Sequence, residues 1–186
     1  MDIFTILLIA IGLSFDTFAV SITTGLSISY IRFWQGVKIA ATLAFFQALM
    51  PLLGYILGKQ VENLISDYDH WIAFGLLFLL GFKMIYESFV KEKDASSSNP
   101  LKTMVLLGMA VATSIDALVV GISFAFVTIN IYLAIFIIGA VTFLVSMIGM
   151  LFGKKLGGKL GKQMEIIGGI ILIGIGFRIL LSHILI

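Results

Sequence analysis

Two aspartates in the middle of long apolar stretches are the residues of this chain best placed to do chemistry. Asp16 lies in the first such stretch and Asp116 in the fourth. If each stretch forms a membrane-spanning helix, both carboxylates lie near the centre of the hydrocarbon layer. A charged Asp there costs about 2.5–3.5 kcal/mol. Because this cost is met twice, we interpret the pair as an ion or proton site. The alternative is a protonated Asp that only hydrogen-bonds a neighbouring helix.

Polar side chains near these two aspartates carry mostly oxygen donors. The candidate ligands are Asp16, Asp116, Ser14, Gln47, Thr113 and Ser114. Pro51 also removes the helical hydrogen bond to the carbonyl of residue 47, which predicts a further free oxygen. The chain has no cysteine, and carboxylate, amide and hydroxyl oxygens suit Mg, Ca and Mn. We therefore predict a divalent-cation site, while each single Ser or Thr could instead bond to its own helix.

Three further charged residues are possible accessory groups: Lys83, Arg178 and Glu165. Lys83 and Arg178 could extend to the lipid headgroups, or they could neutralise an acidic residue such as an empty aspartate site. Glu165 opens the last predicted helix, where it could interact with the helix N-terminus or assist on the cytoplasmic side.

The composition requires most of the surface to face lipid. Hydrophobic residues make up 60% of the 186 residues and charged residues only 12%, and the mean hydropathy is +1.15. A soluble domain carries about 25% charged residues. The apolar runs are continuous rather than alternating, which favours helices over a β-barrel. We predict an all-α integral membrane protein with six transmembrane helices, at residues 3–26, 34–57, 72–89, 101–126, 131–152 and 164–185.

The chain also repeats itself around a hydrophilic segment at residues 91–100. Ser14-Phe15-Asp16 corresponds to Ser114-Ile115-Asp116, Gly54 and Gly58 correspond to Gly149 and Gly153, and Lys83 corresponds to Arg178. We therefore predict one three-helix repeat at residues 1–90, a cytoplasmic linker at 91–100 and a second repeat at 101–186. Three helices per repeat is an odd number, so the two repeats have inverted topology, as in many secondary transporters. The aligned glycines are expected at close helix contacts.

Basic residues predict the orientation and restrict the partners. Nine of them fall in segments on one side, which we place in the cytoplasm with both termini outside: Arg32, Lys38, Lys91, Lys93, Lys102, Lys154, Lys155, Lys159 and Lys162. The formal charge of +2 does not indicate a nucleic-acid partner. The expected partners are the lipid bilayer and a metal dication. An exporter would work against about 2.3 kcal/mol per charge per 100 mV, so coupling to H⁺ is the simplest hypothesis.

Several segments resemble the MntP family of bacterial manganese efflux pumps. They are SFDTFAVS at 14–21, FFQALMPLLG at 45–54, DHWIAF at 69–74, KMI at 83–85, ATSIDA at 112–117 and EIIGG at 165–169. The resemblance covers the whole chain. It implies a bacterial inner-membrane exporter of Mn²⁺ with Asp16 and Asp116 as the main functional carboxylates, and no permanently bound cofactor. The family is similar in plan to lysine and cadmium exporters, so another divalent cation or a basic amino acid is the alternative substrate.

Two paired membrane aspartates also raise the possibility of an intramembrane aspartyl protease. Those enzymes carry a Gly-x-Gly-Asp type segment, whereas Thr113-Ser114-Ile115 precede Asp116 here. We therefore expect a transporter and not an enzyme. A purely structural subunit would leave the paired aspartates without a purpose.

Overall fold

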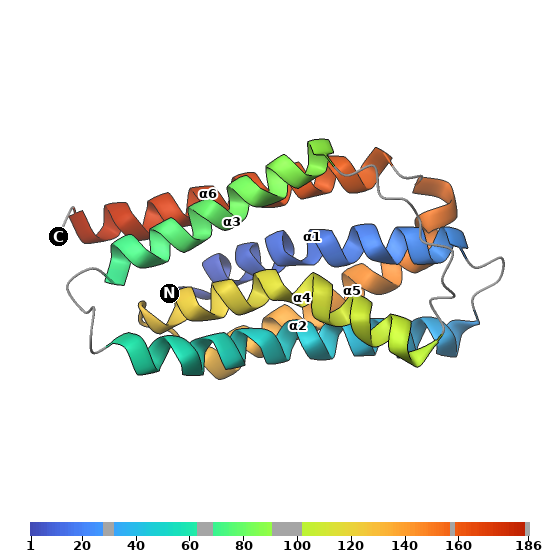
Figure 1. Cartoon of the computed structure of the whole chain (residues 1–186), viewed down its shortest axis with the longest axis horizontal. Coiled ribbons are helices and arrows are strands. Elements are labelled where there is room, and N and C mark those ends of the chain that lie inside the picture. Colours follow the sequence, from blue (N-terminus) through green and yellow to red (C-terminus); the bar gives the residue numbers. More distant parts are fainter. Residues whose placement is uncertain (28–31, 63–68, 91–101, 157–158, 185–186) are drawn as a thin grey trace.

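The helices of the structure follow the predicted apolar stretches. A computed structural model describes residues 1–27, 32–62, 69–90, 102–156 and 159–184 (Figure 1). These ranges form six α-helices: α1 (Ile3–Ser27), α2 (Phe33–Glu62), α3 (Asp69–Val90), α4 (Thr103–Ala125), α5 (Ile131–Leu156) and α6 (Lys159–Ile184). The prediction of an all-α fold is confirmed. The predicted linker at 91–100 lies outside the described residues.

Four of these helices, α1, α2, α4 and α5, are long and apolar enough to cross a membrane. Within the described residues, α3 and α6 contain shorter apolar segments, at 71–86 and 166–181. Those two segments include Lys83 and Arg178. The described part of the chain therefore supports a multi-pass membrane protein with at least four spans, and six spans remain a prediction.

The region between α5 and α6 differs from the prediction. A glycine- and lysine-rich segment was expected to separate helices ending at 152 and beginning at 164. Instead α5 continues to Leu156 and α6 begins at Lys159. Glycine costs a helix only about 1 kcal/mol per residue, so the adjoining helices extend into this segment from both sides when the rest of the fold supports them.

The closest helix pairs join the first half of the chain to the second. The most extensive contacts are α1 with α5, α2 with α4, and α3 with α6. Contacts of α2 with α5 and of α1 with α6 follow, whereas α1 and α4 meet only slightly. Figure 1 shows α3 and α6 together along one side of the bundle, and both chain ends at the same end of the molecule. The two aspartate-bearing helices must therefore be linked through other elements.

Glycines allow these pairs to approach closely. A Cβ atom at Gly121 of α4 would overlap the backbone of Pro51, and one at Gly54 of α2 would overlap the carbonyl of Leu118. A Cβ at Gly149 of α5 would lie 2.8 Å from the Cβ of Ser21 in α1. The predicted packing role of Gly54 and Gly149 is confirmed, because only a residue without a side chain fits at these crossings.

Candidate cation site

The side chain of Gln47 connects the two aspartate-bearing helices. It projects from α2 and is completely buried. Its Nε2 donates a hydrogen bond to the carbonyl oxygen of Leu13 in α1 at 3.1 Å. Its Oε1 accepts a hydrogen bond from the hydroxyl of Ser114 in α4 at 3.0 Å. Because Leu13 is within one turn of Asp16 and Ser114 within one turn of Asp116, a single amide holds both turns at the same depth of the bundle.

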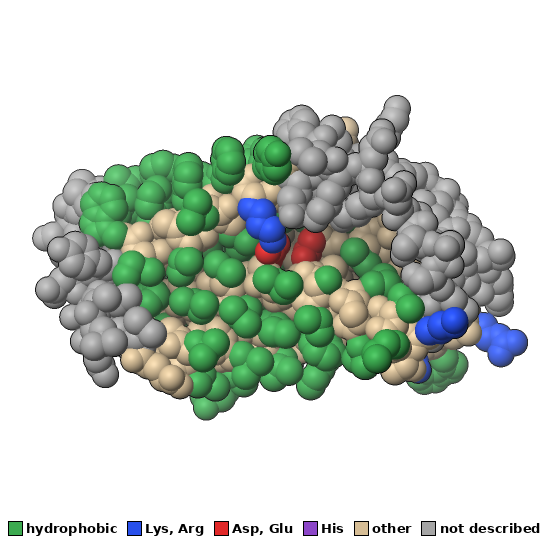
Figure 2. All heavy atoms as spheres, viewed as in Figure 1, with side chains coloured by type: hydrophobic (Ala, Val, Ile, Leu, Met, Phe, Trp, Pro, Cys, Tyr) green, Lys and Arg blue, Asp and Glu red, His purple; other side chains and the backbone are tan. Residues whose placement is uncertain are grey.

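Asp116 lies in the same region and is almost completely buried, with 9% of its surface exposed. Its Oδ1 accepts a hydrogen bond from the Nζ of Lys83 in α3 at 2.6 Å, forming an ion pair. Figure 2 shows acidic side chains recessed beside a basic side chain near the middle of one face, with apolar side chains to their left and below them. An ionised residue inside a membrane protein is tolerated when it is paired in this way.

Asp16 is partly buried on α1 and is bonded to the next residue along the chain. Its Oδ1 accepts hydrogen bonds from the backbone N–H of Thr17 at 2.6 Å and from the Thr17 hydroxyl at 3.3 Å. In a regular α-helix, the N–H of residue 17 faces the carbonyl of residue 13. That carbonyl accepts the amide of Gln47. The polar contacts of Gln47 and Asp16 therefore occupy one turn of α1.

The hydroxyls of the other predicted ligands, Ser14, Thr113 and Ser114, do not all donate to the same kind of acceptor. The Ser14 hydroxyl donates to the carbonyl of Ile11 at 2.8 Å, and the Thr113 hydroxyl donates to that of Met109 at 3.0 Å. Both hydroxyls thus donate to a backbone carbonyl of their own helix, although each hydroxyl oxygen keeps lone pairs that can bind a cation. Ser114 instead donates to Gln47. The helix α2 continues through Pro51.

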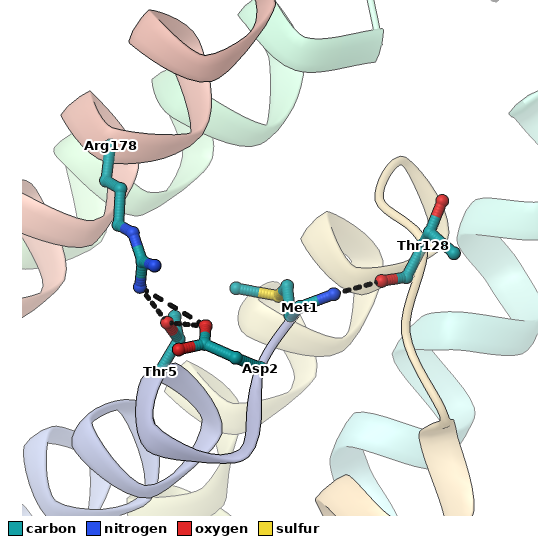
Figure 3. Close-up of polar contacts among 5 residues, drawn as sticks. All are labelled: Met1, Asp2, Thr5, Thr128 and Arg178. Atoms are coloured by element: carbon teal, nitrogen blue, oxygen red, sulfur yellow. Dashed lines mark hydrogen bonds and ion pairs between the residues drawn. The ribbon is translucent and has the colours of Figure 1, made fainter.

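Arg178 lies away from this site, at the end of the bundle where the chain begins. Its guanidinium pairs with Asp2 at 3.3 Å and also donates to the Thr5 hydroxyl, which itself donates to Asp2 (Figure 3). These residues line a cavity of about 250 Å³. The hydrogen bond from Thr5, and then the charge of Arg178, lower the pKa of Asp2 below its ordinary value of 3.8. Glu165 belongs to α6, but its side chain lies outside the described residues.

Sequence reasoning missed the ring of contacts around Arg178. Asp2 and Thr5 have the spacing of a polar group and its partner at a helix start, which is a local signal. Their contact with a residue of the last helix has no such signal, because it depends on how α1 and α6 pack. The predicted equivalence of Lys83 and Arg178 therefore does not extend to their partners, since one pairs with Asp116 and the other with Asp2.

The donor set at the centre favours a hard cation. Within the described residues, no group of three or more His, Asp or Glu side chains could hold a metal ion. Among the described residues, the donors available to a cation at this level are the two aspartate carboxylates and neutral oxygens such as the Gln47 amide and the Ser114 hydroxyl. Such a mixture of carboxylate, amide and hydroxyl oxygens suits Mg, Ca and Mn.

Comparison with known proteins gives a consistent result over the full length of the chain. A family model described as "Mntp: Putative manganese efflux pump" matches residues 30–180. A protein of Clostridium botulinum (strain Hall) named "Putative manganese efflux pump MntP 2" is 45% identical, over 98% of this chain and 96% of its own length. "Putative manganese efflux pump MntP" of Mannheimia succiniciproducens is 46% identical over 98% of both chains. The protein of the same name from Gloeothece citriformis is 45% identical over 98% of this chain and 97% of its own. No solved structure matches the chain.

Proposed function

The chain belongs to the MntP family of manganese efflux pumps, and we propose from this premise that it exports Mn²⁺ from the cytoplasm. The observation that carries the proposal is the Gln47 bridge. This bridge links the helical turn that carries Asp16 to the turn that carries Asp116. The Asp116 carboxylate beside it is buried. Two carboxylates balance the charge of a dication, so Mn²⁺ can lie between apolar helices without a large net charge.

In this proposal the Mn²⁺ ligands are Asp16 and Asp116, assisted by neutral oxygens. The Gln47 and Ser114 oxygens are the best placed of these, because they lie between the two helices. The hydroxyl oxygens of Ser14 and Thr113 are additional donors on the same turns as the aspartates. Mn²⁺ accepts such a set because it prefers carboxylate, carbonyl and water oxygens.

The two halves of the chain are proposed to be inverted repeats that alternate access to this site. The packing pattern supports this, because the two pairs α1–α5 and α4–α2 correspond under the repeat. Gly54 of α2 meets α4 at Leu118 and Gly121, and its counterpart Gly149 of α5 meets α1 at Phe18 and Ser21. The sequence repeat pairs Phe18 with Leu118 and Ser21 with Gly121. Inverted repeats place a substrate site at their interface near the midplane.

The proposed orientation puts both chain ends outside the bacterial inner membrane. The described basic residues Arg32, Lys38 and Lys102 are exposed. Figure 2 shows basic side chains at the end of the molecule opposite the chain ends. Cytoplasmic segments are enriched in Lys and Arg. Export of a dication against an inside-negative potential needs an energy source, and we propose exchange with H⁺.

Reconstitution tests the transport function directly. Purified protein in liposomes is expected to carry Mn²⁺, and a pH gradient is expected to drive Mn²⁺ against its own gradient. Asp16→Asn and Asp116→Asn should each lower the flux by at least about 100-fold, because substitutions that only support metal ligands already cost about 10–100-fold. Gln60→Leu, which changes an exposed amide at the end of α2, is the matched control and should retain full flux.

Competition by other solutes tests the substrate. Excess Ca²⁺, Cd²⁺ or free lysine is added on the side from which Mn²⁺ is taken up. Mn²⁺ flux that persists under these competitors supports a manganese exporter. Transport of lysine, or flux that is the same in the parent and both Asp→Asn variants, would show that the proposed substrate or site is wrong.

A further inference from the structure

The ion pair between Lys83 and Asp116 joins a helix of one half of the chain to the proposed ligand helix of the other half. The Nζ of Lys83 is 2.6 Å from the Oδ1 of Asp116. The lysine side chain is 47% exposed, whereas the aspartate side chain is 12% exposed. The ammonium therefore approaches a nearly buried carboxylate from the more open side. Figure 2 shows a basic side chain lying over recessed acidic side chains.

Ammonium and metal compete for the same carboxylate oxygen. A Mn²⁺ ion bound to Oδ1 of Asp116 would occupy the position that Nζ holds in this structure. A Mn²⁺ ion and an ammonium group held on the same carboxylate would repel each other strongly in a medium of low dielectric constant. Binding of Mn²⁺ to Asp116 therefore requires Lys83 to withdraw, and release of Mn²⁺ allows it to return.

The packing around Lys83 lets this exchange couple to movement of the helices. The contact between α3 and α4 is limited, whereas α3 packs extensively against α6. A Cβ at Gly81 of α3 would lie 2.5 Å from the carbonyl of Gly169 in α6, so these two helices fit closely beside Lys83. The ion pair is thus a principal link between the α3–α6 pair and α4, and it can break without disturbing the α3–α6 contact.

We propose that Lys83 is a tethered counter-cation, which binds Asp116 when the site holds no metal and, together with the H⁺ taken up in exchange, allows the metal-free transporter to return across its cycle. This inference rests on the proposed Mn²⁺ site. With Lys83 in place, the empty site carries one negative charge less, and the cost of an unpaired carboxylate inside the membrane is avoided. Lys83 is a positioning residue in this scheme, because it does not contact the transported ion.

Two transport assays on the full-length protein separate this role from a structural one. Net flux into Mn²⁺-free liposomes requires the metal-free transporter to return. Exchange of labelled for unlabelled Mn²⁺, with equal concentrations on both sides, does not. Lys83→Gln is expected to lower net flux by about tenfold while exchange stays within about twofold of the parent, and to raise Mn²⁺ affinity by about tenfold. Lys83→Arg keeps the cation and should retain net flux. Lys38→Gln removes an exposed lysine from α2 and should change neither assay.

The outcomes of these assays are distinct. If Lys83→Gln lowers net flux and exchange equally, or lowers neither, the tethered-cation role is wrong while Mn²⁺ export stands. If the parent protein carries no Mn²⁺ in either assay, the proposed function fails and this inference fails with it.

A measurement on the unmodified protein guards against a variant that does not fold. Labelling of Lys83 by an amine-reactive reagent, read by mass spectrometry, should become severalfold faster when Mn²⁺ displaces the ammonium from Asp116. Choline chloride at matched ionic strength, whose cation is too large for a site of oxygen ligands, serves as the ionic-strength control. Labelling that Mn²⁺ leaves unchanged or slows would overturn the proposal.

Discussion

Gln47 and Ser114, from helices in opposite halves of the chain, form a buried hydrogen bond of 3.0 Å between amide oxygen and hydroxyl. The same amide donates to Leu13 on the other side. The two helices that carry the aspartates have few direct contacts with each other. The Gln47 side chain of a third helix therefore gives these two helices a direct polar link, and this relationship can be measured.

Removal of the Gln47 amide should destabilise the protein and shift the helices that carry Asp16 and Asp116 relative to each other. Gln47→Leu leaves the Ser114 hydroxyl and the Leu13 carbonyl buried without this partner, which costs about 1–3 kcal/mol for each unsatisfied group. The melting temperature in detergent should fall, and the Mn²⁺ affinity should fall by about 10–100-fold.

A double-mutant cycle with Ser114→Ala isolates the amide–hydroxyl contact. The coupling energy should be about 0.5–3 kcal/mol, because the two groups are in direct contact. Gln60→Leu is the control for loss of an amide from α2. Additive effects of Gln47→Leu and Ser114→Ala would contradict the bridge.

Two glycines of α4 offer a matched test of helix packing. A Cβ at Gly121 would overlap the backbone of Pro51, whereas a Cβ at Gly108 would meet nothing within 4 Å. Gly121→Ala should destabilise the protein by about 1–3 kcal/mol through overpacking. Gly108→Ala should be neutral or stabilise it by up to about 1 kcal/mol, since alanine favours the helix. Thermal unfolding in detergent compares the two, and equal effects would argue against the close α2–α4 crossing.

Four buried hydroxyls should contribute little to stability. Ser21, Thr24, Thr142 and Ser146 have no hydrogen-bond partner within the described part of the chain. A buried hydroxyl without a partner costs free energy, so Ser146→Ala should leave the free energy of unfolding unchanged or raise it by up to about 1 kcal/mol. The melting temperature should accordingly stay the same or rise. Ser114→Ala is the control, because its hydroxyl is bonded and its loss should lower the melting temperature. If both variants lose the same stability, Ser146 has a partner in the membrane-embedded protein, such as a bound water.

The Asp2–Arg178 pair should not contribute to the pH dependence of transport near neutrality. The pKa of Asp2 lies below 3.8, chiefly because Thr5 donates a hydrogen bond to it. A lowered pKa means that the stabilisation is fully present above the unfolded value and is lost only as the pH falls through the lower folded value. Asp2→Asn should therefore leave the shape of the flux profile unchanged between about pH 5 and 8.

The same variant should affect stability in a pH-dependent way. Above about pH 5 Asp2→Asn should be slightly less stable than the parent, and the difference should disappear in strong acid. A flux profile that shifts along the pH axis on Asp2→Asn would show that this carboxylate takes part in proton exchange, contrary to expectation. Thr5→Val, which removes the hydroxyl that contacts both charged groups, serves as the control.

The pattern of apolar residues alone was enough to predict the helices and the position of each aspartate within its helix. In lipid the backbone must bond within its own segment, so each long apolar run has to form a helix. Asp16 and Asp116 were identifiable because a carboxylate in such a run is expensive. Gly54 and Gly149 were recognisable as packing positions because a repeat placed them in corresponding helices. All of these signals are local or depend on a comparison of two segments of the same chain.

Which helices pair, and where the long polar side chains point, became known from the folded structure. A helix that is apolar on every side has no stripe to indicate which face meets a neighbour. The sequence therefore could not show that α2 packs on α4, or that Gln47 reaches both Leu13 and Ser114. Lys83 and Arg178 occupy corresponding positions, yet Lys83 binds Asp116 and Arg178 binds Asp2. A flexible basic side chain takes the acidic partner that packing brings within its reach, and that packing is a property of the whole bundle.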